Sequence, residues 1–171
     1  MTTKIINLFG EPSAGKSTTA AHLFALMKHD GRDVELVTEF AKDITYEGHK
    51  NLLEDQLFLL ANQHRRIARL AGQIEYIITD SPLLLNLLYT DESYFSSYKQ
   101  LVKEIFYSYN NVNFLLKRSK PYNPKGRNQT EEEARELSVK LRKLLDENVF
   151  QYHDLQGNSS AARNILTIMK L

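Results

Sequence analysis

Five short apolar runs alternate along the chain with segments whose apolar residues recur at helical spacing. The runs predict strands at residues 5–9, 34–38, 76–80, 112–116 and 149–155. The helical segments cover residues 18–27, 52–71, 83–89, 94–109, 130–147 and 159–171. Strands that alternate with helices are typical of βαβ units, which form a parallel sheet covered by helices on both faces. The pattern therefore predicts an α/β fold.

Two of the predicted helices carry clear end signals. Segment 52–71 places apolar residues on or near one face and is followed by Gly72, a residue typical of a helix C-terminus. Thr130 precedes another helix and has Glu133 three residues later, which is the spacing of a capping box. These signals predict one long helix over 52–71 and a helix that begins at Thr130.

The turn after the first strand carries the strongest chemical signal. Residues 10–17 read Gly-Glu-Pro-Ser-Ala-Gly-Lys-Ser, which fits the phosphate-loop pattern G-x-x-x-x-G-K-[ST]. A strand precedes this segment and a helix follows it, as a phosphate loop requires. Backbone N–H groups and the positive end of the helix dipole then converge on one anion site. The sequence therefore predicts binding of a nucleoside triphosphate.

This pattern assigns roles to individual residues. We expect Lys16 to reach the β- and γ-phosphates and the Ser17 hydroxyl to bind Mg²⁺. The predicted nucleotide-binding residues in this segment are Gly10, Ser13, Ala14, Gly15, Lys16, Ser17 and Thr18.

Asp80 ends the third predicted strand, where a second acidic motif of phosphate-loop proteins lies. It would hold Mg²⁺ or accept a proton from an attacking hydroxyl. The alternative is that Asp80 caps the following helix, with Pro82 at the first helical position. Ser81 follows Asp80, whereas ATPases usually carry a water-activating glutamate there, and no Asn-Lys-x-Asp guanine motif occurs. These absences favour a kinase over a motor ATPase or a GTPase.

Charged residues follow two other strands. Glu39 follows the second strand and would bind or deprotonate an acceptor hydroxyl; the alternative is a solvated loop acid. Arg118 ends the fourth strand, and Arg127 lies further along a polar, basic segment at about 118–129 that we interpret as a short lid. Both arginines would compensate charge on the transferring phosphoryl group, although the basic residues of this segment would also be explained as solvated.

Other residues have two readings each. Gly157 and Asn158 follow the fifth strand, where the adenine would lie, or they form a plain turn. The segment His64-Arg65-Arg66 is a solvated face with one packed histidine, or it contacts substrate. Several tyrosines would stack on a base or pack in the core: Tyr89, Tyr94, Tyr98, Tyr107 and Tyr109.

Composition limits the remaining classes. A chain of 171 residues supports a single domain, 1–171. It has no cysteine, which excludes thiolate chemistry and suits a cytoplasmic location. The longest apolar segment, 77–88, is interrupted by Asp80, Pro82 and Asn86, so no membrane span is predicted. A net charge of +1 gives no general attraction to nucleic acid.

Over almost its whole length the sequence resembles P-loop kinases of the nucleoside and nucleotide kinase group. The phosphate loop and Thr-Glu-Phe-Ala-Lys at 38–42 resemble the ribosylnicotinamide-kinase-like branch. So does the basic segment 122–129, which precedes the acidic residues 131–133. The resemblance implies a three-layer fold with sheet order 2-3-1-4-5, Mg-ATP as donor, and Glu39 and Asp80 near the acceptor.

The resemblance leaves the acceptor open. Lys42 stands where that branch has arginine. Compact phage members of the group resemble kinases that phosphorylate 5-hydroxymethyluracil in DNA, for which the lid with Arg65 and Arg66 would supply a basic channel. We expect an ATP-dependent kinase of a nucleoside-type hydroxyl, acting in the cytoplasm, or in the host cytoplasm if the chain is phage-encoded. The alternatives are a ribosylnicotinamide kinase and a nucleotide-dependent switch protein that is not a kinase.

Overall fold

The structure is a computed structural model that describes residues 2–90, 93–119, 130–149 and 151–171. Its five strands are β1 (Lys4–Phe9), β2 (Val34–Val37), β3 (Tyr76–Thr79), β4 (Asn110–Lys117) and β5 (His153–Gln156). Every neighbouring pair is parallel, and the order across the sheet is β2-β3-β1-β4-β5. The predicted parallel sheet and its strand order are confirmed.

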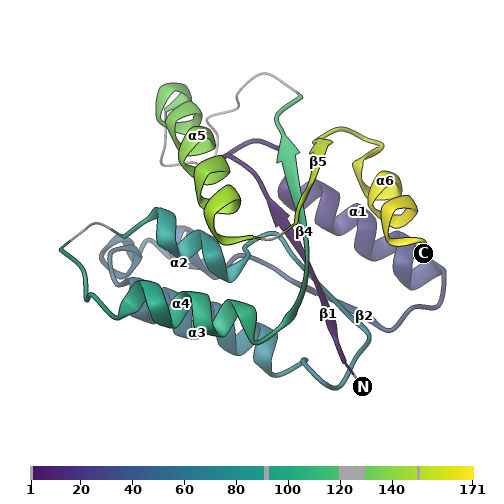
Figure 1. Cartoon of the computed structure of the whole chain (residues 1–171), viewed down its shortest axis with the longest axis horizontal. Coiled ribbons are helices and arrows are strands. Elements are labelled where there is room, and N and C mark those ends of the chain that lie inside the picture. The colour runs from purple at the N-terminus through teal and green to yellow at the C-terminus, as the bar shows by residue number, and fades with distance from the viewer. Residues whose placement is uncertain (1, 91–92, 120–129, 150) are drawn as a thin grey trace.

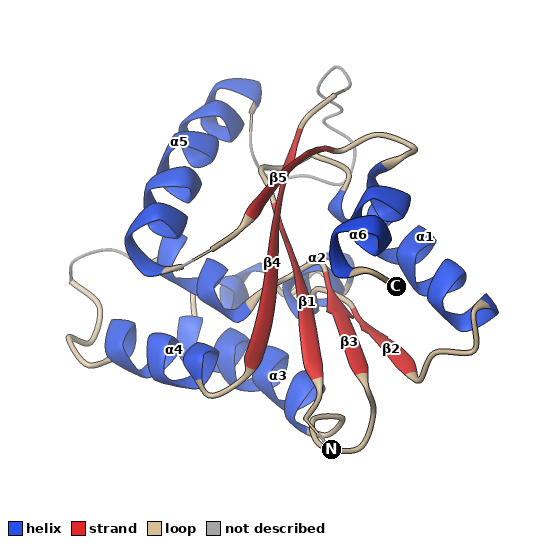
Figure 2. Ribbon diagram, turned by 45° about the vertical axis from the view of Figure 1, so that its right-hand side comes forward, coloured by secondary structure: helices blue, strands red, loops and turns tan. Residues whose placement is uncertain are grey.

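Helices cover both faces of the sheet (Figures 1 and 2). The helices α1 (Lys16–His29) and α6 (Ala161–Met169) lie on one face. The other face is covered by α3 (Gln56–Ala68), α4 (Tyr98–Tyr107), α5 (Glu131–Asn148) and the 3₁₀ helix η2 (Leu83–Leu88). A short helix α2 (Phe40–Tyr46) and a 3₁₀ helix η1 (Lys50–Leu53) connect β2 to α3. This is the predicted three-layer α/β fold.

Two apolar clusters fill the spaces between the layers. Side chains of successive strand residues point to opposite faces of a sheet, so Ile5 and Ile6 belong to different clusters. Ile5 packs with residues of α3, α4, α5 and η2, including Leu60 and Phe106. Ile6 packs with residues of α1 and α6, including Leu23. The central strands are buried on both faces, which explains their continuous apolar runs.

Several predicted boundaries were wrong. The segment 52–71 is not one helix: η1 ends at Leu53, and α3 begins only after Asp55, whose side chain accepts a hydrogen bond from Phe58 N. Leu57 is 40% exposed rather than part of the buried face. The helix expected at 83–89 is the 3₁₀ helix η2, and α4 begins four residues later than expected. The fifth strand begins at His153 rather than at 149.

The capping box at the start of α5 is confirmed. The Thr130 hydroxyl accepts a hydrogen bond from Glu133 N at 3.2 Å, and the Glu133 carboxylate accepts one from Thr130 N at 2.6 Å. Replacing Thr130 with alanine removes one of these bonds and should lower the free energy of unfolding by about 0.5–2 kcal/mol. Urea unfolding measures this change. Thr130→Ser keeps the acceptor oxygen, and an equal loss in that variant would contradict the explanation.

Candidate functional site

The phosphate loop forms the turn between β1 and α1. Gly15 adopts a positive φ of 88° at the N-cap of α1, a conformation that glycine adopts without strain. Among the described residues no side chain caps this helix. The N–H groups of its first turn and its dipole therefore remain available to an anion. The geometry fits the phosphate site that the sequence predicted.

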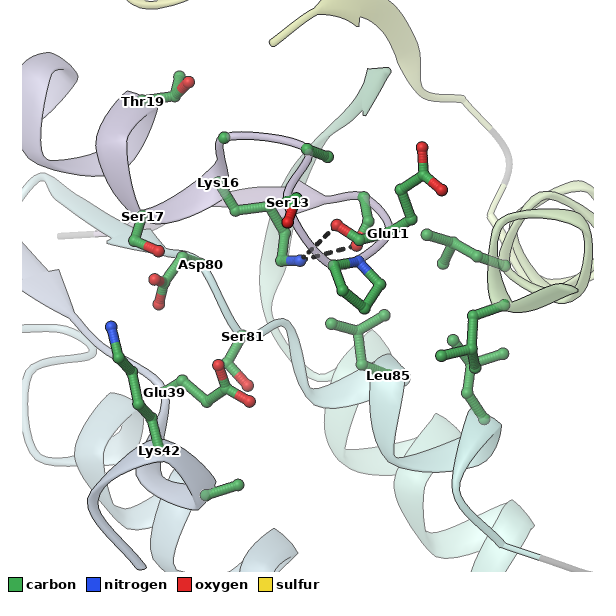
Figure 3. A pocket seen from close by; sticks show the side chains of 18 of the residues that line it. Glu11, Ser13, Lys16, Ser17, Thr19, Glu39, Lys42, Asp80, Ser81 and Leu85 are labelled. Carbon is green, nitrogen blue, oxygen red and sulfur yellow. Dashed lines mark hydrogen bonds between the residues drawn. The ribbon is translucent and has the colours of Figure 1, made fainter. Parts of the chain in front are cut away.

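Lys16 lies over its own loop (Figure 3). Its ammonium donates hydrogen bonds to the carbonyl oxygens of Gly10 at 2.8 Å and Glu11 at 3.2 Å. A flexible lysine exchanges such backbone contacts for phosphate oxygens at little cost, because the ammonium stays at the mouth of the same turn.

Asp80 lies beside Ser17 and is only 5% exposed (Figure 3). Burial raises the pKa of its carboxyl group, while the charges of Lys16 and Lys42 and a hydrogen bond from Ser17 partly oppose that rise. Within the described part of the chain, Asp80 Oδ1 has no hydrogen-bond partner. An unsatisfied, buried carboxylate oxygen next to a hydroxyl is a suitable ligand for Mg²⁺. The structure thus brings together the two residues predicted to hold the metal.

The alternative role of Asp80 as a helix cap is wrong. The residue at the N-cap of η2 is Pro82, and no side chain in the described residues caps this helix. Helix capping therefore does not explain why Asp80 is buried.

This burial predicts opposite effects of Asp80→Asn on stability and activity. A carboxyl group with a raised pKa in the folded state binds its proton more tightly there, so stability falls as the pH rises from 3.8 through the folded-state pKa. At neutral pH the amide avoids the cost of burying an ionised group. We expect a higher melting temperature than wild type at pH 7, a difference that vanishes below pH 3.8, and at least about 10²-fold slower phosphate transfer.

Thermal unfolding at several pH values and steady-state kinetics measure these effects. Asp33→Asn, a change at an exposed position before β2, is the matched control and should alter neither. A lower melting temperature for Asp80→Asn at pH 7 would contradict the conclusion that burial of the ionised Asp80 carboxylate lowers the stability of the fold.

Glu39 is the N-cap residue of α2. The sequence predicts no helix or strand between residue 38 and residue 52, so the short helix that starts at Phe40 was missed. Figure 3 shows Glu39 and Lys42 near Asp80 and across the cavity from Lys16. The structure thus places Glu39 at the wall of the site instead of on a solvated loop.

A single cavity of about 640 Å³ connects the phosphate loop to Glu39. At one end it is lined by the loop and the first turn of α1. Beyond these, its lining combines apolar side chains with polar and charged ones. The apolar ones include Phe40, Leu53, Leu59, Leu85 and Leu88, and the polar or charged ones include Lys42, Gln56, Gln63, Asp80, Asn86 and Tyr89. This composition is typical of a small-molecule site.

Arg118 reaches the phosphate loop from the end of β4. Its guanidinium is paired with Glu11 of the loop at 3.6 Å and with Glu131 of α5 at 3.2 Å, and its side chain is only 13% exposed. It is therefore largely shielded from solvent beside the phosphate loop. Residues 120–129 of the predicted lid, Arg127 among them, lie outside the described residues, so their roles stay predictions.

Gly157 packs directly against the phosphate loop. A Cβ atom at this position would lie 1.8 Å from the carbonyl oxygen of Ala14. Gly157 N donates to Lys117 O at 2.8 Å, which ties this turn to β4. The Asn158 side chain accepts hydrogen bonds from Ser160 and so organises the turn itself. Both residues line the cavity, and contact with adenine remains a prediction.

Most of the side chains for which the sequence left both a functional and a structural role open make structural contacts. His64 shares a hydrogen bond with the Tyr109 hydroxyl at 2.8 Å, and burial lowers its pKa. Tyr98 is 2% exposed and donates to Gln56 O, while Tyr94 accepts from Leu57 N. Arg66 pairs with Asp43. Of the tyrosines singled out in the sequence, Tyr89 lines the cavity.

Sequence reasoning missed several lining residues. Gln56 and Gln63 lie on α3, Asn86 lies on η2, and Tyr46 is the last residue of the missed helix α2. They follow no motif and lie more than 25 positions from the phosphate loop. Gln56 and Gln63 are polar residues among the apolar residues on the buried face of α3. A polar side chain at such a position was the only signal in the sequence that could have pointed to them.

None of the helices in the described part of the chain combines the length and apolar character that crossing a membrane requires.

The strand order, the helical layers and the loop after β1 are those of the P-loop kinase fold. The chain belongs to the AAA domain family AAA_28, which matches residues 5–163. A search of curated proteins found no match to this sequence.

Solved structures with low sequence identity share the fold. A thymidylate kinase from Ehrlichia chaffeensis is 15% identical with a TM-score of 0.66, and the match covers 99% of this chain and 100% of that one. A deoxyadenosine kinase from M. mycoides with bound dATP is 18% identical with a TM-score of 0.58 and coverages of 96% and 97%. The NadR protein in complex with NR is 15% identical with a TM-score of 0.75, over 99% of this chain and 52% of NadR.

Proposed function

We propose that this protein is an ATP-dependent kinase that transfers the γ-phosphate to a hydroxyl group of a nucleoside-type acceptor. The observation that carries the proposal is the single cavity. It joins the phosphate loop to a chamber of mixed apolar and polar side chains whose wall includes Glu39. A phosphate loop alone serves many classes of protein, but an adjoining chamber of this composition provides a place for an acceptor.

The donor end of the cavity fits ATP and Mg²⁺. The loop amides and Lys16 would hold the β- and γ-phosphates, and Ser17 and Asp80 would hold the metal. Bound Mg²⁺ would neutralise charge on the phosphate oxygens. The described residues contain no group of three or more His, Asp or Glu side chains arranged to hold a metal ion. Phosphate oxygens and water would therefore complete the metal's coordination, as is usual for Mg²⁺ in kinases.

At the acceptor end we assign the proton transfer to Glu39. The acceptor oxygen forms a bond to the γ-phosphorus while the bond from that phosphorus to the β–γ bridging oxygen breaks, and ADP leaves. The hydroxyl proton goes to the Glu39 carboxylate, because Asp80 is committed to the metal beside Ser17. Arg118 would compensate charge on the transferred group. Catalysis rests on positioning and electrostatics, without a covalent intermediate.

The structural neighbours agree with this reading at the level of the fold. They are a thymidylate kinase, a deoxyadenosine kinase and NadR in complex with NR. We therefore propose a free nucleoside or nucleotide as the first acceptor to test. Ribosylnicotinamide is the alternative. Lys42 points toward Asp80 and lowers its pKa, so a cation is present at the position where that branch has arginine.

A DNA acceptor that carries 5-hydroxymethyluracil receives less support. Arg66, one of the two arginines proposed for a basic channel, pairs with Asp43 and stacks on Phe40. It is therefore occupied in holding α2 rather than presented to a phosphate backbone. This acceptor stays in the test because the lid lies outside the described residues.

A comparison of acceptors tests the proposal. We would measure kcat/KM for free nucleosides, nucleoside monophosphates, nicotinamide riboside, and DNA with or without 5-hydroxymethyluracil, each with Mg-ATP. The expected result is saturable transfer to one small-molecule class. Transfer to modified DNA alone would keep the kinase and replace the acceptor. ATP binding without transfer to any acceptor would support a switch protein and overturn the proposal.

A further inference from the structure

The segment that carries Glu39 is held by side chains of α3. Gln63 accepts a hydrogen bond from Phe40 N at 2.8 Å through Oε1, and its Nε2 donates to Thr38 O at 3.3 Å. These two backbone groups flank Glu39 on either side. Gln63 is 4% exposed, so both bonds lie away from competing water. One amide therefore fixes the backbone before and after the candidate base.

Arg66 holds the same segment one helical turn later. Its guanidinium lies 5.0 Å from the centre of the Phe40 ring, and Nη1 donates to Thr38 O at 3.4 Å. The guanidinium also pairs with Asp43 of α2. Residues three positions apart on a helix share a face, so Gln63 and Arg66 act on one target. We call these two residues the α3 clamp.

The sheet does not fix this segment. β2 is an edge strand, and its pairing with β3 ends at Val37 opposite Thr79. Glu39 therefore lies two residues beyond the last paired position, at the N-cap of a seven-residue helix. Short helices are marginal by themselves. The backbone at Thr38–Phe40 thus depends on contacts from outside the sheet, and the α3 clamp supplies them.

We propose that Gln63 and Arg66 are positioning residues that hold the Glu39 carboxylate in register with the acceptor hydroxyl. This inference rests on the proposed kinase function. The uncharged amide of Gln63 donates one hydrogen bond and accepts another at the same time. An ionised carboxylate can only accept hydrogen bonds, and an ammonium group can only donate them. A displacement of about 1 Å at a reacting group lowers rates by about 10²-fold. The clamp therefore affects turnover through Glu39 and leaves the phosphate loop untouched.

A double-mutant cycle tests the inference. We would compare wild type, Gln63→Met, Glu39→Gln and the double variant in steady-state transfer from labelled ATP. Gln63→Met should lower kcat by about 10- to 100-fold with KM for ATP unchanged. Glu39→Gln should lower it by about 10²–10⁴-fold. In the Glu39→Gln background, Gln63→Met should cause no further loss, since the group that it positions is gone.

A second variant protects the test against a folding defect. Arg66→Met keeps an aliphatic stem on Phe40 but loses the contact with Thr38 O and the pair with Asp43. Arg66→Met should lower kcat less than Gln63→Met does. In the Glu39→Gln background it should cause no further loss of kcat. Gln73→Met makes the same replacement at an exposed position after α3 and should leave kcat unchanged.

The outcomes separate the inference from the proposed function. Equal fold losses from Gln63→Met with and without Glu39, or an unchanged kcat in Gln63→Met, would overturn the clamp while the kinase stands. An unchanged kcat in Glu39→Gln would also overturn it, because there would be no base to position. Absence of transfer by wild type to any acceptor would overturn the proposed function, and the clamp with it.

Discussion

Lys16→Ala is expected to lower phosphate transfer from ATP by at least about 10²-fold and to leave the fold intact. The lysine contributes a positive charge at the point where negative charge gathers on the β- and γ-phosphates. Its present hydrogen bonds go to carbonyls of its own loop, Gly10 and Glu11. Their loss exposes groups at an open cavity, so the cost to folding is small. Circular dichroism and steady-state kinetics measure the two effects.

The matched control for this prediction is Lys28→Ala. Lys28 lies on the same helix, is exposed, and pairs with Glu35 at 3.0 Å. Exposed pairs of this kind contribute about 0–1 kcal/mol, so activity should be unchanged. Normal turnover by correctly folded Lys16→Ala would contradict the assignment of the loop as the phosphate site.

Gly157→Ala is expected to impair nucleotide binding although Gly157 lies outside the phosphate-loop motif. The added Cβ would lie 1.8 Å from Ala14 O and 3.2 Å from Lys117 O, and both are backbone atoms. Neither atom moves without shifting the loop or the end of β4. We expect a loss of stability of at least about 1–3 kcal/mol and a large rise in the Kd for ATP, measured by urea unfolding and by calorimetry.

Gln156→Ala is the control for this steric argument. It places the same side chain one residue earlier, at an exposed position of β5, and should bind ATP as wild type does. An unchanged Kd for ATP in Gly157→Ala would show that the backbone after β5 can move to accommodate the added Cβ atom, and that it does not determine the conformation of the phosphate loop.

The sequence predicts the fold well because two independent signals agree. Buried parallel strands give continuous apolar runs, and these placed four strands near their observed positions. The fifth, β5, is half-exposed and reads His-Asp-Leu-Gln, so no continuous apolar run marks it and its predicted start was four residues too early. The motif at 10–17 fixed one strand-to-helix turn, since it requires a specific backbone shape. The boundaries between 50 and 56 failed because apolar spacing continued across a break that only the cap at Asp55 marks.

The donor end of the site was easier to predict than the acceptor end. Lys16, Ser17 and Asp80 come from motifs or strand ends, and parallel topology brings strand ends together. The proposed acceptor chamber includes Gln56 and Gln63 from α3, Leu85 from η2, and Tyr89 directly after η2. Their convergence depends on how α3 and η2 pack, and no local pattern encodes that packing. The missed helix α2 is seven residues long, too short to show a periodicity.

The central claim is that this protein transfers phosphate to an acceptor rather than to water. The most direct measurement follows the label of γ-labelled ATP with Mg²⁺, with and without a panel of nucleosides and nucleotides. We expect the label to enter one acceptor and the release of free phosphate without acceptor to be slow, because Ser81 occupies the place of a water-activating glutamate. Rapid release of free phosphate, unaffected by every acceptor, would contradict this claim.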